Sequence, residues 1–226
     1  MPREEEEMLK RTLIAGLGLV LCASAQASVT YQDTVGDLFD NGLGNLDITS
    51  VDVSHDEGNV YMSINLNADI ASANWGKYLI AINAFDDGTG SNPWGRNIDF
   101  GGEGIDRFIG SWADGGGGAM GYHHFTDWYE QSGVSVDFSD ASSGAIHYTI
   151  SRDWLGAPYD SFKFDVMTSG GGSFDPGVDH LSRSDQATGG WGETSYSGDF
   201  LVYDLPAPGA LVLLGLAGIA RSRRRH

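Results

Sequence analysis

Four aspartates stand close together near the start of the domain, at Asp33, Asp37, Asp40 and Asp47, with glycines between them. Calcium takes about six to eight oxygen ligands, from carboxylates and backbone carbonyls, and glycines allow a loop to wrap the ion. We therefore expect Asp33, Asp37 and Asp47 to hold a structural calcium ion. The alternative is a solvated turn in which these carboxylates accept hydrogen bonds from nearby backbone amides. The Asp-x-Asp-x-Asp-Gly spacing of an EF-hand is absent.

Five of the six tryptophans lie in or beside segments rich in Asn, Asp, Gly and Arg: Trp75, Trp94, Trp112, Trp128 and Trp191. An aromatic ring stacks on the apolar face of a pyranose, while carboxylates and amides bind its hydroxyls. We expect a carbohydrate-binding surface built from these tryptophans, with Arg96 and Asn97 as polar contacts beside Trp94. The alternative is a core position for each ring, because tryptophan is highly buried on average. Trp154 is expected in the core.

Carboxylate pairs are the main candidates for acid–base catalysis, namely Asp86 with Asp87 and Glu103 with Asp106. The chain has 31 acidic residues, so pairs of this kind arise by chance. No Gly-x-Ser-x-Gly, P-loop or dinucleotide-binding motif is present. We expect a non-catalytic protein.

Zinc and haem are not expected. His123 and His124 are adjacent, and adjacent side chains on a strand point to opposite faces, which does not suit a zinc site. Met62, which could serve as an axial haem ligand, alternates with Val60 and Ile64 on an apolar face and is expected in the core.

The elements that position these residues are expected to be strands, because apolar and polar residues alternate with period two and helical periodicity is nearly absent. Gly-rich connections between many strands predict one all-β domain over residues 28–205, an antiparallel β-sandwich. Two long connections, Asp86–Gly104 and Gly170–Ser197, are expected to be functional. The expected strands are Leu46–Val53 with a phase shift near Ser50, Val60–Leu66, Tyr78–Phe85 buried on both faces, Phe108–Trp112, Val134–Phe138, Ile146–Ile150, Phe162–Val166 and Phe200–Leu205.

Several short motifs lie along the domain: Asp33-x-x-Gly36-Asp37, Leu46-Asp47-Ile48-x-x-Val51-x-Val53, Trp75 to Ile82, Asn92-Pro-Trp-Gly95 and Asp179-His-Leu181. Together they resemble motifs of the DOMON-like β-sandwiches, which include family 9 carbohydrate-binding modules and the C-terminal domain of glucodextranase. The resemblance implies a jelly-roll type of sandwich from a superfamily whose members bind sugars or haem. It also implies calcium in the acidic loop, which related sandwiches often carry.

The domain is strongly acidic. Of the 31 acidic residues four lie in Glu4–Glu7, and of the 13 basic residues seven lie in the two terminal segments, so residues 28–205 carry 27 acidic and six basic residues, a net charge of about −21. Such a surface repels nucleic acid and attracts divalent cations. We expect no nucleic-acid partner.

Residues 1–27 have the pattern of a secretory signal peptide, with Met8 as an alternative start. A basic segment precedes an apolar run, and Ala25 and Ala27 supply the small residues of a cleavage site. The single cysteine, Cys22, lies inside this segment, so the mature chain would have no disulfide and no thiolate metal site.

Residues 206–226 begin with Pro206-Ala207-Pro208, continue with the apolar run Gly209–Ala220 and end in a basic cluster of Arg221, Arg223, Arg224 and Arg225. This layout resembles the PEP-CTERM sorting signal of exported bacterial proteins, in which Pro-Glu-Pro stands at the position of Pro206-Ala207-Pro208. As a helix the run would rise only about 18 Å, short of the bilayer core. The resemblance implies transient association with the inner membrane and cleavage by a membrane protease. The alternative is an ordinary tail anchor.

These patterns predict an exported protein of the cell surface or extracellular matrix that binds carbohydrate in extracellular polysaccharide. One alternative is a structural or adhesive surface protein whose aromatic residues are all core, and another is a glycan-processing enzyme. Two exposed tryptophan rings about a saccharide's width apart would favour binding. A cleft with two carboxylates about 5–10 Å apart would favour the enzyme.

Overall fold

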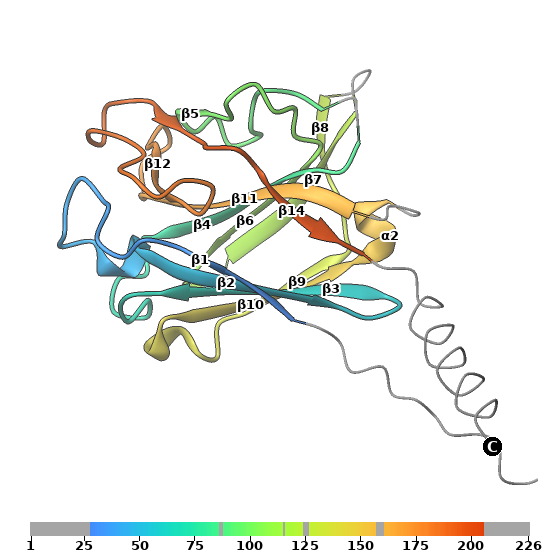
Figure 1. Cartoon of the computed structure of the whole chain (residues 1–226), viewed down its shortest axis with the longest axis horizontal. Helices are drawn as coiled ribbons and strands as arrows, with labels where there is room; N and C mark the ends of the chain where they lie inside the picture. Colours follow the sequence, from blue (N-terminus) through green and yellow to red (C-terminus); the bar gives the residue numbers. More distant parts are fainter. Residues whose placement is uncertain (1–27, 86–87, 115, 124–126, 157–160, 206–226) are drawn as a thin grey trace, which may run out of the picture.

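Two antiparallel β-sheets face each other across a shared apolar core (Figure 1). The computed structural model describes residues 28–85, 88–114, 116–123, 127–156 and 161–205. Within them the chain is all-β, with only short helices: the 3₁₀ turns η1 (Gly44–Leu46) and η2 (Ala141–Ser143) and the single-turn α2 (Arg152–Leu155).

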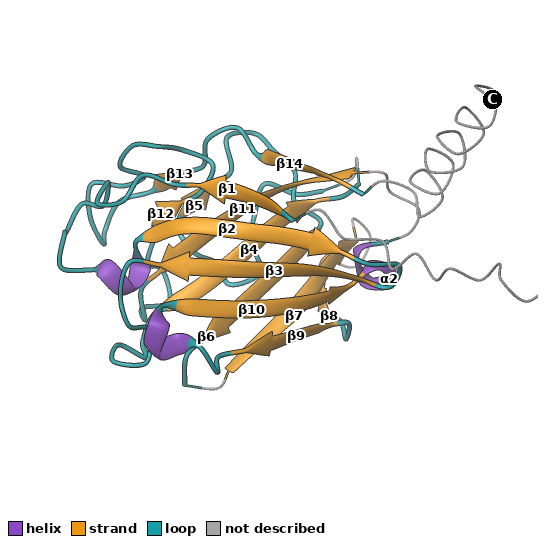
Figure 2. Ribbon diagram, turned by 60° about the horizontal axis from the view of Figure 1, so that its bottom comes forward, coloured by secondary structure: helices purple, strands orange, loops and turns teal. Residues whose placement is uncertain are grey.

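The first sheet has five strands, which lie in front in Figure 2. In spatial order they are β1 (Val29–Gln32), β2 (Ile48–His55), β3 (Asn59–Leu66), β10 (Ala145–Ser151) and β9 (Val134–Asp137). The second sheet has seven strands, with β14 (Leu201–Asp204) paired to β11 beside the main path. Its main path is β12 (Gly177–His180), β11 (Ser161–Ser169), β4 (Lys77–Asn83), β6 (Arg107–Trp112), β7 (Gly116–His123) and β8 (Asp127–Glu130).

The central residues of each expected strand are confirmed as strand, and the predicted bounds differ from the observed ones at the ends. The predicted irregularity near Ser50 is a register shift between Ile48 and Ser50 against β3. The predicted strand starts at Leu46, but Leu46 belongs to η1 and β2 begins at Ile48. Strand β4 is buried along both faces, as expected from its continuous apolar sequence.

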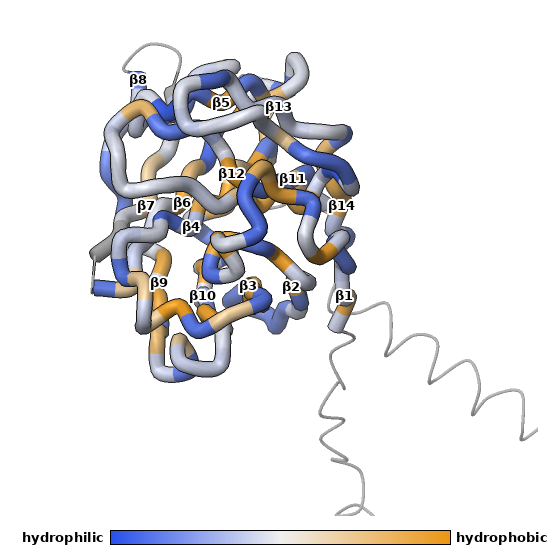
Figure 3. The backbone as a smooth tube through the Cα atoms, turned by 90° about the vertical axis from the view of Figure 1, so that its left-hand side faces the viewer, coloured by the Kyte–Doolittle hydropathy of each residue, from blue (hydrophilic) through white to orange (hydrophobic). Residues whose placement is uncertain are grey.

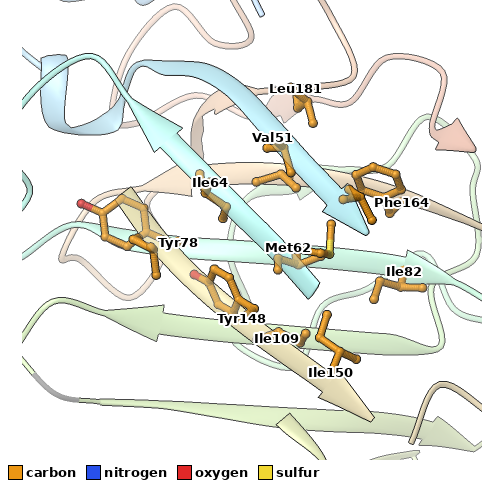
Figure 4. Close-up of a cluster of buried hydrophobic side chains, with 14 of the residues drawn as sticks. Val51, Met62, Ile64, Tyr78, Ile82, Ile109, Tyr148, Ile150, Phe164 and Leu181 are labelled. Atoms are coloured by element: carbon orange, nitrogen blue, oxygen red, sulfur yellow. The ribbon is translucent and has the colours of Figure 1, made fainter. Parts of the chain in front are cut away.

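The core between the sheets takes the inward-facing side chains of both. Figure 4 shows Met62, Tyr148 and Ile109 pointing into this layer, and Met62 has no exposed surface, which confirms its core position. The Tyr148 hydroxyl is satisfied by Ser111 Oγ at 2.7 Å. Trp154 is 5% exposed and packs against the same cluster, as expected.

A second, smaller core lies on the outer face of the seven-stranded sheet. Leu79, Ala81 and Phe108 project from that face and pack with Phe100 and Phe200 from the connections that cover it. Phe100 lies in the predicted connection Asp86–Gly104, and Phe200 follows the predicted connection Gly170–Ser197 directly before β14. The two connections are joined by the parallel pair of β5 (Ile98–Asp99) and β13 (Ser195–Tyr196).

The two ends of the domain differ in what they carry. Strand β1 begins, and β14 finishes, at the end occupied by α2 (Figure 1). The acidic loop after β1, the connection before β4 and the connection between β11 and β12 lie at the opposite end, onto which Figure 3 looks. We call this opposite end the loop end.

Among the described residues no helix has the length and apolar character to cross a membrane. The predicted signal peptide with Ala25 and Ala27, and the predicted sorting signal with Pro206, Pro208 and the four arginines, lie outside the described residues.

Candidate metal centre and aromatic surface

Three aspartates from distant parts of the chain meet at the loop end. Asp37 lies in the loop after β1, Asp47 directly precedes β2, and Asp179 lies on β12. One carboxylate oxygen of each lies within 4.8 Å of the others. Two of the three expected ligands, Asp37 and Asp47, are therefore brought together, and Asp33 is close enough for its charge to interact with theirs. Asp40 is exposed and outside the group.

Backbone amides fix two of these carboxylates in place. Asp47 accepts hydrogen bonds from the Gly36 amide through both oxygens, at 3.0 and 3.1 Å. Gly36 has φ +83, a conformation that glycine adopts without strain. Asp179 Oδ2 accepts from the Ile48 amide at 2.6 Å, and its Oδ1 accepts from the His180 amide at 2.8 Å.

Asp37 and Asp33 are less completely bonded, although Asp33 Oδ1 accepts from the Thr34 amide at 2.7 Å. Both oxygens of Asp37 and Oδ2 of Asp33 are buried, with no hydrogen bond from another described residue. Burial raises the pKa of Asp33 to about 7, and the nearby charge of Asp37 adds to this shift. Burial also raises the pKa of Asp37, and it raises the pKa of Asp179 well above its ordinary value.

Buried carboxylates of this kind need either protons or a cation, because several negative charges without compensation are costly in a buried site. An all-oxygen donor set suits a hard cation such as calcium better than zinc. Asp37, Asp47 and Asp179 would hold the ion, and Asp33 lies beside them. From the sequence, Asp179 is recognised only as part of the motif Asp179-His-Leu181 and not as a metal ligand. Its place 132 positions after Asp47 hid its role, because only the pairing of β12 with β11 brings it to the loop.

An exposed pair of tryptophans lies at the loop end. Trp75 and Trp191 are 40% and 39% exposed, and their ring centroids are 6.2 Å apart at an interplanar angle of 72°. Phe39 meets the Trp191 ring edge to face at 5.2 Å. We call Phe39, Trp75 and Trp191 the aromatic surface. Phe174, which is 76% exposed, lies in the connection between β11 and β12 that adjoins this surface.

A glycine loop, Gly170–Gly172, lies between the two tryptophans. A Cβ atom on Gly170 would lie 2.6 Å from the Trp191 ring, and one on Gly171 would lie 3.6 Å from Trp75 Cβ. Only backbone fits so close to Trp191, which explains the glycine at position 170.

Arg96 and Asn97 bond to the loops that carry this surface. Arg96 is 8% exposed, and its Nη1 donates to Ser169 Oγ and to the carbonyls of Gly170 and Gly172, at 2.6–3.1 Å. Asn97 Oδ1 accepts a hydrogen bond from Thr194 Oγ1 at 2.9 Å. The sequence predicts both side chains as direct sugar contacts. Arg96 is buried and instead orders the glycine loop beside Trp191, whereas Asn97 is partly exposed, and its contact with a sugar stays a prediction.

The remaining three expected tryptophans form a separate group over β6. Trp94 packs against Phe108 and Trp112, with centroids 5.7 and 5.6 Å apart, and Trp128 packs against Phe108 at 6.4 Å. Their rings are partly buried. The Trp94 ring lies so close to Gly110 that a Cβ there would be 2.2 Å from it. These contacts make the group an outer layer of packing on the seven-stranded sheet.

The carboxylate pair Glu103 and Asp106 is engaged in the fold. Glu103 accepts from Lys163 at 2.6 Å, and Asp106 Oδ2 accepts from the amides of Ala84 and Phe85. The pair Asp86 and Asp87 lies outside the described residues, as do His124 and the side chain of His123.

Sequence reasoning missed an Asp–His–Ser chain. His180 Nδ1 lies 2.9 Å from Asp165 Oδ2, and its Nε2 lies 3.0 Å from Ser195 Oγ. All three residues have no exposed surface, so a substrate has no path to the serine in this structure. The chain joins β11, β12 and β13, and its role is to brace them. The residues are 15 or more positions apart along the chain, which gave no local signal.

No known family model matches this sequence, and a search of curated proteins finds no match. The function is therefore inferred from the chain's own residues.

Proposed function

We propose that this protein is a non-catalytic carbohydrate-binding β-sandwich of the DOMON-like, jelly-roll type, exported and associated with extracellular polysaccharide. The observation that carries the proposal is the pair of Trp75 and Trp191, each about two-fifths exposed, with centroids 6.2 Å apart. A structural protein whose aromatic residues were all core would bury both rings.

The geometry of the pair suits a sugar. The rings stand at 72° to each other and so form a corner. One ring can stack on the apolar face of a pyranose while the other contacts its edge, and neighbouring backbone and carboxylate groups take the hydroxyls.

Calcium is the second part of the proposal. Bound by Asp37, Asp47 and Asp179, the ion would join the loop after β1 to β12. The only cysteine is Cys22, so no disulfide can do this within the domain. An ion that binds only the folded state stabilises it by mass action, which offsets part of the entropy lost in ordering the loops.

Export is the third part. The signal peptide would direct secretion, and the PEP-CTERM-like segment would give transient attachment to the inner membrane before cleavage. The position of the described ends of the domain supports this, because β1 begins and β14 finishes at the end opposite the aromatic surface (Figure 1). A tether there would leave Trp75 and Trp191 facing away from the membrane.

Tryptophan fluorescence of the full chain, titrated with a panel of polysaccharides in calcium, tests the proposal. We expect a saturable, glycan-selective change that Trp75→Ala and Trp191→Ala each weaken by about tenfold, as for other aromatic contacts central to an interface. Trp128→Phe is the matched control, because it alters an aromatic ring outside the surface. A flat response to every glycan would reject carbohydrate binding in favour of the structural alternative.

A further inference from the structure

The described residues contain six lysine and arginine side chains, and each already has a partner in the protein. Two are buried: Arg96 donates to the glycine loop, and Arg107 Nε donates to the Trp154 carbonyl at 2.7 Å. The other four are held near the surface: Lys77 by the Trp75 carbonyl at 2.9 Å, Arg152 by the Asp56 carbonyl at 3.3 Å, Lys163 by Glu103 at 2.6 Å and Arg183 by Asp185 at 2.8 Å.

Negative charge is abundant by comparison. Of the 27 acidic residues in the domain, Asp86, Asp87 and Asp160 lie outside the described residues, which leaves 24 against six cations. Lys163 and Arg183 are paired with carboxylates, whereas Lys77 and Arg152 donate to backbone carbonyls. The net charge of the described residues is therefore strongly negative, and it would repel an acidic polysaccharide.

One carboxylate belongs to the aromatic surface itself. The Cβ position of Gly170 lies 2.2 Å from Asp175 Oδ2 and 2.6 Å from the edge of the Trp191 ring, so that oxygen and that ring are within about 4.8 Å of each other. Asp175 Oδ2 accepts from the Gly172 amide at 2.7 Å, which fixes the carboxylate. Its Oδ1 takes part in no hydrogen bond with a described residue, and Asp175 is partly exposed.

Arg96 partly balances this charge. Burial lowers the pKa of Arg96, and the charge of Asp175 acts in the opposite direction. The hydrogen bonds of Arg96 go to Ser169, Gly170 and Gly172 and not to Asp175. The carboxylate is therefore positioned beside an exposed ring without a direct cationic partner.

We infer that the aromatic surface selects glycans that lack acidic groups, either neutral or amino-substituted, and that Asp175 accepts hydrogen bonds from their hydroxyl or ammonium groups. This inference rests on the proposed carbohydrate binding and names its ligand class. An aromatic face beside a carboxylate suits an amino sugar in particular, because the ring stacks on the sugar while both groups attract the ammonium charge.

Binding of the full chain to three polymers tests the inference: a neutral glucan, a partially deacetylated glucosamine polymer and polygalacturonate, each in calcium and again in chelator. We expect polygalacturonate to bind at least about tenfold more weakly than the other two, under both conditions.

The variant Asp175→Asn keeps an acceptor for the Gly172 amide but removes the charge. It should weaken binding of the amino polymer by about tenfold, the loss expected for one charge-assisted hydrogen bond, and that of the glucan by less. Glu57→Gln is the matched control, because Glu57 is an exposed acid in the turn between β2 and β3, away from the aromatic surface. It should leave the affinity for both polymers unchanged.

The outcomes separate the two proposals. Binding of polygalacturonate as tight as that of the glucan, or an Asp175→Asn variant that binds the amino polymer as tightly as the wild type, would overturn the ligand class and leave carbohydrate binding standing. Failure of all three polymers and of the wider panel would overturn both.

Discussion

The ring of Phe39 meets the ring of Trp191 edge to face, with centroids 5.2 Å apart and planes at 86°. Phe39 follows Asp37 by two residues in the acidic loop, whereas Trp191 belongs to the long connection before β13. This contact joins the candidate metal centre to the aromatic surface. Any ion that orders the acidic loop should therefore also order one wall of the surface that we propose binds sugar.

Removal of the Phe39 ring should separate the two sites. We expect Phe39→Ala to weaken glycan binding by several-fold, because Trp191 loses an edge-to-face neighbour that is worth about 0.5–1.5 kcal/mol. Calcium binding should be preserved, since no carboxylate is changed. Isothermal titration with calcium, and with glycan in saturating calcium, measures both. Loss of calcium binding in this variant would mean that Phe39 supports the whole loop, and unchanged glycan affinity would show that the contact has no role in binding.

Calcium should raise the thermal stability of the full chain, and chelator should reverse the effect. A ligand present at about 100 times its dissociation constant stabilises by about 2.7 kcal/mol, which for a domain of this size is a Tm increase of roughly 5–10 °C. Differential scanning calorimetry with and without calcium measures this shift.

The variants Asp47→Asn and Asp179→Asn should abolish the calcium-dependent shift, because each removes one charged ligand from the group. Asp40→Asn is the matched control, since Asp40 is exposed in the same loop and lies outside the group. A full calcium response in Asp179→Asn would exclude the proposed centre, and an equal loss in Asp40→Asn would point to charge in general and not to a site.

Replacement of Arg96 should destabilise the domain. Arg96→Gln leaves Ser169 Oγ and the Gly170 carbonyl without this donor in a buried position, and we expect a loss of about 2–4 kcal/mol in the free energy of unfolding. Urea unfolding measures it. Arg183→Gln, which removes a cation paired with the exposed Asp185, is the control and should change stability by less than about 1 kcal/mol. Equal effects of the two variants would contradict a buried anchoring role for Arg96.

Two glycines that face each other across β6 and β7 should respond oppositely to alanine. A methyl group on Gly110 would lie 2.2 Å from the Trp94 ring, so Gly110→Ala should cost about 1–3 kcal/mol through overpacking. Its register partner Gly118 has no atom within 4 Å of the added methyl, so Gly118→Ala should be neutral or stabilise by about 0.5 kcal/mol. Urea unfolding of both variants checks the pair. Tolerance of alanine at position 110 would mean that Trp94 does not lie on the sheet.

Stability at mildly acidic pH should depend on His55. Burial lowers the pKa of His55 from its ordinary value of 6.5, and the charge of Arg152 acts in the same direction. As the pH falls through about 6.5, the unfolded chain takes up a proton that the folded chain accepts less readily, so stability is lost on the acid side. As the pH falls from about 7.5 to about 5.5, the free energy of unfolding of the wild type should therefore decrease more than that of His55→Gln. A difference that is constant over this range would exclude the effect.

The sequence predicts the strands whose inward and outward residues differ in polarity. Strand β3, where Val60, Met62 and Ile64 alternate with polar residues, is the clearest example, and strand β4 is recognised because both of its faces are covered. The strand at Gly116–His123 was missed, because its first three residues are glycines and carry no side chains to alternate. Its existence depends on pairing with β6, a tertiary contact that composition does not reveal.

The same contrast between local sequence pattern and tertiary contact holds for the residues of the candidate sites. Asp37 and Asp47 were predicted as ligands because they lie near each other in the sequence and share a glycine-rich loop. Asp179 required knowledge of which strand edge faces that loop. For the tryptophans, residue type predicts that rings gather near loops, but only the fold separates the exposed Trp191 from the partly buried Trp94.

The parallel pairing of Ile98 with Ser195 joins residues 97 positions apart. Closing so long a segment costs chain entropy, and the two-residue strands β5 and β13 make only a few contacts to offset it. Long-range contacts of this kind form slowly. The hairpins β2–β3 and β6–β7 need no such closure and are expected to form early in folding. Trp191, which lies just before Ser195, would therefore reach its place late. The aromatic surface would then be completed only with the last contacts of the fold, so the ability to bind would appear at the end of folding.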